Sequence, residues 1–251
     1  MAKKKVKVVQ CPQLKPYIET LELKWKIEYK EGKMGFMQIG SDPSKKIHHI
    51  FLPKADFHLP DGVHELGHAA LTERVDIQLS SAFFSHKYHQ LRNEPQRHFK
   101  EMCKWFVLCW GAVVDVWAND LVNQFWPELI IQGINDLNEK CEMVEEAGQT
   151  AIFSEWNIAI GLALHMGEIR RFGLYLERNR IFELLLQFDT ESQNILTRLS
   201  RLLASLPRLT YEREADLKTL EEAVQAVNKI LNFPINPRLV EENGRMVWEL
   251  D

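Results

Sequence analysis

The residues of this chain best suited to chemistry are His64, Glu65 and His68, which lie within the five-residue sequence HELGH. Imidazoles four residues apart on a helix lie one turn apart on the same face, so both can bind one metal ion. Zinc accepts such nitrogens and keeps a position open for water when three protein ligands bind it. A glutamate after the first histidine can take a proton from that water and pass it to a leaving amine. The spacing predicts a zinc site with Glu65 as general base.

The alternative is an amphipathic helix that carries two histidines by chance, because matches to a motif this short also arise at random. The flanking sequence favours the metal site, since an exposed helix would not combine an apolar stripe with two clustered imidazoles without a reason. Gly67 also keeps the helix slim beside the ion. The apolar residues around the motif are Val63, Leu66, Ala69 and Leu71.

A third ligand is expected from Asp115, which ends the apolar run WFVLCWGAVV at 105–114. A carboxylate in such surroundings needs a partner, and a metal ion supplies one. Asn119 follows one turn later on the same face, where it could hydrogen-bond a ligating imidazole. Alternatively, Asp115 pairs with Lys104 or Arg97, or faces solvent. Further candidates for the third ligand are His86, His89 and Glu128.

HELGHAAL followed by D-V-W-A-N-D-L-V resembles the gluzincin metallopeptidases, and most of all the ImmA/IrrE type, whose HELGH helix is followed by a helix with E-x-x-A-N. The resemblance implies that His64 and His68 bind Zn²⁺ and that Glu65 is the general base. It places the family's third ligand, a glutamate, at Asp115, with Asn119 matching the asparagine of the motif. The implied activity is hydrolysis of a peptide or protein substrate.

Other histidines are weaker candidates. His48, His49 and His58 precede the motif, and one of them could contact substrate. The segment KKIHHIFLP occupies the place where zincins have an edge strand that pairs with a peptide. Such an enzyme also needs a hydrogen-bond donor to the oxyanion of the transition state. The candidates for this donor are His86, His89, His165 and Tyr211. The apolar run around His165 favours instead a histidine packed in the core.

The elements that would position these residues change in type along the chain. The first sixty residues are β-rich: VKVVQC is a short apolar run, LELKWKIEYKEGKMGFMQIG alternates around Glu31-Gly32 as in a hairpin, and KKIHHIFLP is a strand that Pro53 ends. Helical spacing begins at the HELGH segment, with Asp61 as the expected N-cap.

The rest of the chain is mostly helical. A polar stretch precedes the long apolar helix HFKEMCKWFVLCWGAVVDVWANDLVNQFW, which Pro127 ends. Helical periodicity dominates from Gly133 onward, with a cap at Asp189-Thr190, and Asn243-Gly244 predicts a closing hairpin. We therefore expect an α+β fold: a small N-terminal β-sheet packed on a zincin-like HExxH helix and a long second helix, followed by a mostly α-helical C-terminal region. The expected division is a metallopeptidase core at 1–130 and a helical region ending in a hairpin at 131–251, which could form one continuous domain.

Composition narrows the class of protein. The chain has 251 residues and a formal net charge of -4, which argues against a broad nucleic-acid surface. Its four cysteines form no C-x-x-C pair, which favours a reducing cytoplasm. The run WFVLCWGAVV is too short to span a bilayer. We expect a cytoplasmic protein with no nucleic-acid or membrane partner. Two alternatives are a non-catalytic or regulatory zinc protein acting through its helical C-terminal half, and a helical interaction protein without metal.

Overall fold

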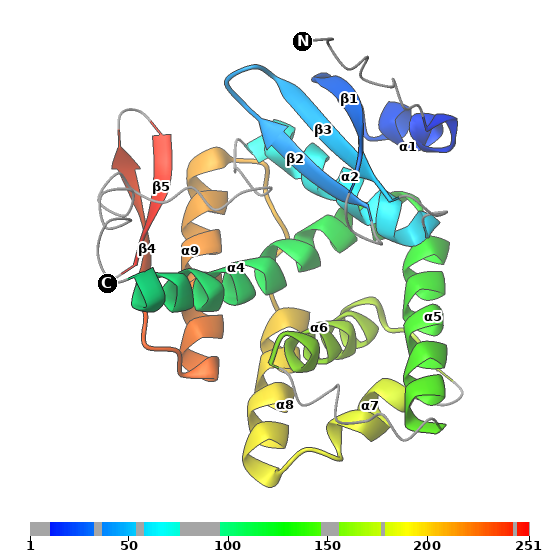
Figure 1. The fold of residues 1–251 in the computed structure, drawn as a ribbon, viewed down its shortest axis with the longest axis vertical. Coiled ribbons are helices and arrows are strands. Elements are labelled where there is room, and N and C mark those ends of the chain that lie inside the picture. The colour runs from blue at the N-terminus through cyan, green and yellow to red at the C-terminus, as the bar shows by residue number, and fades with distance from the viewer. Residues whose placement is uncertain are drawn as a thin grey trace, which may run out of the picture. The chain divides into compact units, whose positions relative to one another are not determined.

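The computed structural model describes residues 11–32, 37–53, 58–75, 96–146, 156–176, 179–242 and 245–250 (Figure 1). The fold is α+β, with mostly helices and a small mixed sheet. The chain divides into two compact units, residues 1–81 and residues 82–251. The predicted domain boundary near residue 130 stays a prediction. VKVVQC up to Gln10, and the polar stretch with His86 and His89, lie outside the described residues.

The first unit holds a three-stranded sheet in the order β1-β3-β2, with β1 parallel and β2 antiparallel to β3. The predicted strands form, but the hairpin predicted around Glu31-Gly32 is wrong, because β3 separates the two strands it would join. The elements are η1 (Pro12–Leu14), α1 (Lys15–Thr20), β1 (Lys26–Glu31), β2 (Gln38–Asp42), β3 (Ile47–Leu52) and α2 (Leu59–Val75).

Two local features explain this pairing. Gly32 donates its amide to the Leu52 carbonyl at 2.7 Å, and a Cβ at Gly32 would lie 2.9 Å from that oxygen, so glycine serves a close approach to β3. The hairpin turn lies instead between β2 and β3. There Asp42 accepts from the Lys45 amide at 3.2 Å, and Lys46 adopts a left-handed φ of 52°. KKIHHIFLP is consequently the central strand, so the expectation that it is an edge strand is wrong.

Helix α2 lies against this sheet (Figure 1) and is buried along most of its length. It begins at Leu59, two residues before Asp61, so the predicted N-cap at Asp61 is wrong. Pro60 is tolerated in the first turn because its missing N–H has no partner there. Asp61 lies in that turn, where His58 Nδ1 is 3.1 Å from its carboxylate.

The second unit is helical with a terminal hairpin. Helix α4 packs against α5, α6 and α9, and α6 packs against α8. Pro127 ends α4 and begins α5, and the Asp189 side chain caps α8 by accepting from the Ser192 amide at 3.0 Å, as predicted. The elements are α4 (Gln96–Phe125), α5 (Pro127–Glu146), α6 (Trp156–Phe172), α7 (Arg180–Leu185), α8 (Thr190–Ala204), α9 (Arg213–Leu231), β4 (Pro237–Glu242) and β5 (Arg245–Leu250). The predicted closing hairpin is confirmed by the antiparallel pairing of β4 and β5.

Residues 101–125 of α4 are long and apolar enough, by length and composition, to cross a membrane. Within the structure, 67% of their most apolar window is buried. Phe106, Val113 and Trp117 are each at most 1% exposed. Burial of this kind is typical of the core helix of a folded domain.

A buried polar network joins the sheet of the first unit to α2. The His48 side chain, on β3, is fully buried and stacks on Trp25, with ring centroids 5.0 Å apart. Its Nε2 lies 2.9 Å from the Glu73 carboxylate, which also accepts from the Lys24 and Trp25 amides. Since a carboxylate only accepts, His48 Nε2 carries the proton and Nδ1 accepts from the Ser41 hydroxyl at 2.7 Å. The network satisfies every polar group it buries.

Acidification should weaken this network. Burial lowers the pKa of His48 below its ordinary value of 6.5, although the Glu73 carboxylate raises it and His49 lowers it further. Above pH 6.5 the stabilisation is complete. As the pH falls through the folded-state pKa it is lost, because the unfolded chain takes up the proton more readily. We expect the free energy of unfolding to fall as the pH drops below 6.5, by up to about 1.4 kcal/mol per pH unit from this group. Urea unfolding of wild type and His48→Gln should show a shallower pH slope in the variant; equal slopes would contradict the assignment.

Candidate metal centre

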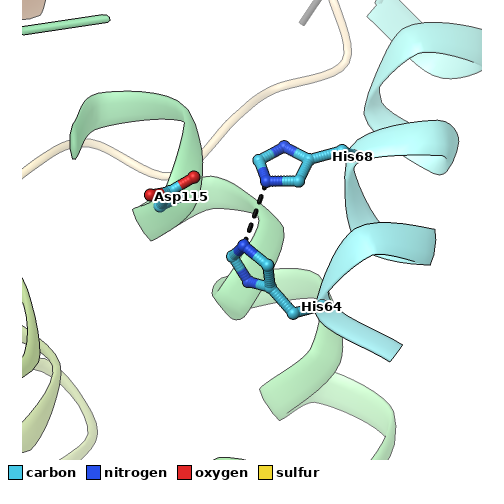
Figure 2. A group of neighbouring side chains, drawn as sticks. All are labelled: His64, His68 and Asp115. Carbon is cyan, nitrogen blue, oxygen red and sulfur yellow. Dashed lines mark hydrogen bonds between the residues drawn. The ribbon is translucent and has the colours of Figure 1, made fainter. Parts of the chain in front are cut away.

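The imidazoles of His64 and His68 converge on α2 (Figure 2). Their Nε2 atoms lie 3.0 Å apart, and the ring planes are nearly perpendicular, at 89°. In a tetrahedral zinc site with Zn–N bonds of about 2.0–2.1 Å, two ligating nitrogens lie about 3.3 Å apart. One Nε2 now donates a proton to the lone pair of the other, and a metal ion can replace that proton. The pair therefore already has nearly the spacing that zinc requires.

Glu65 lies between these histidines in sequence and contacts the sheet. Its Oε2 accepts from the Ile39 amide of β2 at 3.0 Å. Ile39 is opposite Ile50 in the register, and its N–H points away from β3 to the outer edge of the sheet. The candidate general base is thus held at the edge of β2.

Asp115 and Asn119 lie on α4, in the second unit. Asp115 is half-buried between Val114 and Val116, which are each 1% exposed. Asn119 is 7% exposed, and its Nδ2 donates to the Glu168 carboxylate. The partnership of Asp115 with the two histidines stays a prediction.

The other residues that the sequence suggested for the site differ in how far they are exposed to solvent. His48 is fully buried, which excludes the substrate contact suggested for it. His49 lies 3.4 Å from Glu28 and its side chain is 25% exposed. Glu128 is an exposed residue in the first turn of α5, and Tyr211 is 46% exposed at a left-handed φ of 64°.

His165 differs from the packed core histidine that its sequence favours. Its side chain is 32% exposed, and its Nδ1 lies 2.8 Å from Glu168 Oε2. Glu168 is only 2% exposed, and neither it nor Glu73 was a sequence candidate. The signal for Glu168 was present: a carboxylate three residues after a histidine, in the otherwise apolar run LALHMGEI, needs a polar partner.

Comparison of the chain with models of known protein families, with curated proteins and with solved structures finds no match. The resemblance to the gluzincins therefore rests on the residues of HELGH and D-x-x-A-N themselves.

The contact between Glu65 and Ile39 can be tested by stability. Glu65→Ala removes the acceptor and leaves the Ile39 N–H unsatisfied, whereas Glu65→Gln keeps a carbonyl oxygen for it. We expect the alanine variant to lose about 1–3 kcal/mol of unfolding free energy in urea, and the glutamine variant clearly less. Glu19→Ala, at an exposed position of α1, is the control and should stay within about 0.5 kcal/mol of wild type. Equal losses in both Glu65 variants would refute this role for the carboxylate.

Proposed function

We propose that the protein is a zinc-dependent metallopeptidase, similar to the gluzincins of the ImmA/IrrE type, that hydrolyses a peptide or protein substrate with Glu65 as general base. One observation carries the proposal. The Nε2 atoms of His64 and His68 lie 3.0 Å apart on α2, and the residue after His64 is a glutamate.

The proposed zinc ligands are His64, His68 and Asp115. Each offers one ligand atom that zinc accepts, an imidazole nitrogen or a carboxylate oxygen. Figure 2 draws the three side chains, the histidines on α2 and the aspartate on α4. Asp115 is supported by its half-buried place in an apolar helix and by its position in D-x-x-A-N. Asn119, whose amide nitrogen is engaged by Glu168, would act on a ligating imidazole through its Oδ1.

In this proposal Glu65 moves the protons. When bound, zinc lowers the pKa of a water molecule toward neutrality. Glu65 takes a proton as water attacks the peptide carbonyl, and it delivers that proton to the leaving amine. The Ile39 N–H holds the carboxylate in place. Because Glu65 lies at the outer edge of β2, we propose β2 as the strand beside which an extended substrate pairs.

The cysteines argue against a thiol-dependent reaction, and free thiols fit the proposed cytoplasmic location. None of the four, which all lie among the described residues, forms a disulfide. Burial raises the pKa of Cys109 to about 12, and it also raises the pKa of Cys11 and Cys103. A thiol with a raised pKa is a poor nucleophile at neutral pH.

Metal content and one substitution test the activity. Purified wild-type protein should hold about one zinc per chain and cleave an unfolded protein such as labelled casein, and a chelator should stop the cleavage. Glu65→Gln should keep the zinc and lose cleavage by at least about a hundredfold, since general-base catalysis supplies that order of rate. Protein without zinc refutes the metal site. Zinc with no cleavage in the wild type would favour the non-catalytic zinc protein instead.

The third ligand is tested by zinc affinity. Asp115→Ala should weaken zinc binding by more than the roughly ten- to hundredfold loss typical of removing an outer-shell partner. Glu128→Gln, at the exposed reserve candidate, is the matched control and should bind zinc as wild type does. A loss in the Glu128 variant with none in the Asp115 variant would assign the ligand to Glu128.

A further inference from the structure

A serine, a histidine and a glutamate lie in line within the first unit, and none of them has a part in the proposed peptidase reaction. The Ser41 hydroxyl, on β2, lies 2.7 Å from His48 Nδ1, on β3. The other nitrogen of the same ring, Nε2, lies 2.9 Å from the Glu73 carboxylate on α2. A serine bonded to a histidine that is in turn bonded to a carboxylate is the arrangement that activates a serine as a nucleophile.

The protons of this group are placed for that chemistry. Since the Glu73 carboxylate only accepts, His48 Nε2 carries the ring proton, and the lone pair of Nδ1 faces the serine. Burial lowers the pKa of His48, which keeps the ring neutral at pH 7. A neutral imidazole whose lone pair faces a hydroxyl is a general base for that hydroxyl, and the carboxylate stabilises the imidazolium that forms when the proton moves.

The surroundings hold the three side chains in place. The His48 ring stacks on Trp25, with centroids 5.0 Å apart and planes inclined by 16°. Glu73 accepts from the backbone amides of Lys24 and Trp25, at 2.8 to 3.0 Å. Ser41 and His48 are directly opposite each other in the register of β2 and β3, so the sheet sets their separation. A nucleophile and a base that are held in position before the reagent arrives react faster.

Exposure separates the nucleophile from its base. Ser41 is half-buried and lies next to the turn 43–46, whose last three residues are exposed. His48 is fully buried. A reagent can therefore reach the hydroxyl, whereas the ring cannot reach a leaving group or activate a water molecule.

A purely structural role explains the two buried members of the group better than the serine. The His48 and Glu73 side chains are 0% and 8% exposed, so each needs a partner inside the protein. The Ser41 hydroxyl is half-buried and could bond to water equally well. Its direct bond to Nδ1 is the contact that a reactive serine requires.

We infer that Ser41 is a covalent acylation site, with His48 as its general base and Glu73 as the positioning residue of the base. The reagents are acyl donors with an acidic leaving group, such as aryl esters or acyl phosphates, because the buried ring cannot protonate a leaving group.

In this reaction Ser41 Oγ attacks the acyl carbon, and its proton moves to His48 Nδ1. The bond from carbon to the leaving group breaks, and the leaving group departs as an anion with the bonding electrons. The proton remains on the ring beside the Glu73 carboxylate until local opening releases it to solvent. The product is an ester at Oγ, which persists because His48 does not activate water against it.

The probe is p-nitrophenyl acetate, added to the full chain near pH 7 with and without a chelator. Wild type should release about one equivalent of p-nitrophenolate in a burst, as acyl-enzyme formation does, and peptide mass spectrometry should place the acetyl group on Ser41. The chelator should change neither result, because the group contains no proposed zinc ligand. Ser41→Ala should lose the burst, and His48→Gln should slow it by at least about a hundredfold, the contribution of a general base.

Ser44→Ala is the matched control, because it removes a nearby exposed serine outside the group, and it should keep the burst. Wild type unfolded in urea replaces the His48 variant if that variant does not fold, and it should lose the burst. The inference is overturned if the wild type shows no burst, or if the burst survives in Ser41→Ala, survives unfolding or disappears with the chelator. None of these results bears on cleavage that depends on Glu65, so the proposed function is tested separately.

Discussion

The first unit depends on how two glutamates of α2 satisfy backbone amides of the sheet region. Glu65 accepts from Ile39 of β2, and Glu73 accepts from Lys24 and Trp25 just before β1. These contacts fix the rotation of the helix about its own axis, because both carboxylates must face the sheet. At 3.6 residues per turn, the two histidines then point roughly a third of a turn away from the glutamates. The direction of His64 and His68 is therefore a consequence of where the glutamates find their donors.

In the second unit, too, polar side-chain contacts fix how a helix packs, here against another helix. Helix α4 is mostly apolar, and two polar residues in its last two turns bond to partners on α6: Asn119 to Glu168, and Asp120 to Arg171. Such pairs are costly to bury and costly to break, so they set the register of the two helices. Glu168 also bonds the His165 Nδ1 at 2.8 Å. Each unit thus pairs a glutamate with a histidine, Glu73 with His48 in the first and Glu168 with His165 in the second.

In the proposed reaction, α2 would supply two nitrogen ligands and a general base, and Asp115 would supply a carboxylate. These groups would have separate tasks, since metal binding and proton transfer from water each need a different atom. Because the tasks are separate, a single substitution can abolish turnover while the zinc content stays unchanged.

Local sequence determined much of the fold on its own. The HELGH helix, the helix that Pro127 ends, the Asp189 cap and the Asn243-Gly244 hairpin all depend on residues near one another in the chain, so spacing was enough to predict them. It also marked His64, Glu65, His68 and Asp115 as a set. Strand pairing was not local: Gly32 serves a close approach to Leu52 rather than a turn, which only the sheet reveals. The tertiary structure likewise decided that His48 is a buried member of the Glu73 network and that Glu168 holds His165. A buried polar group is defined by partners distant in sequence, and those partners are known only once the chain has folded.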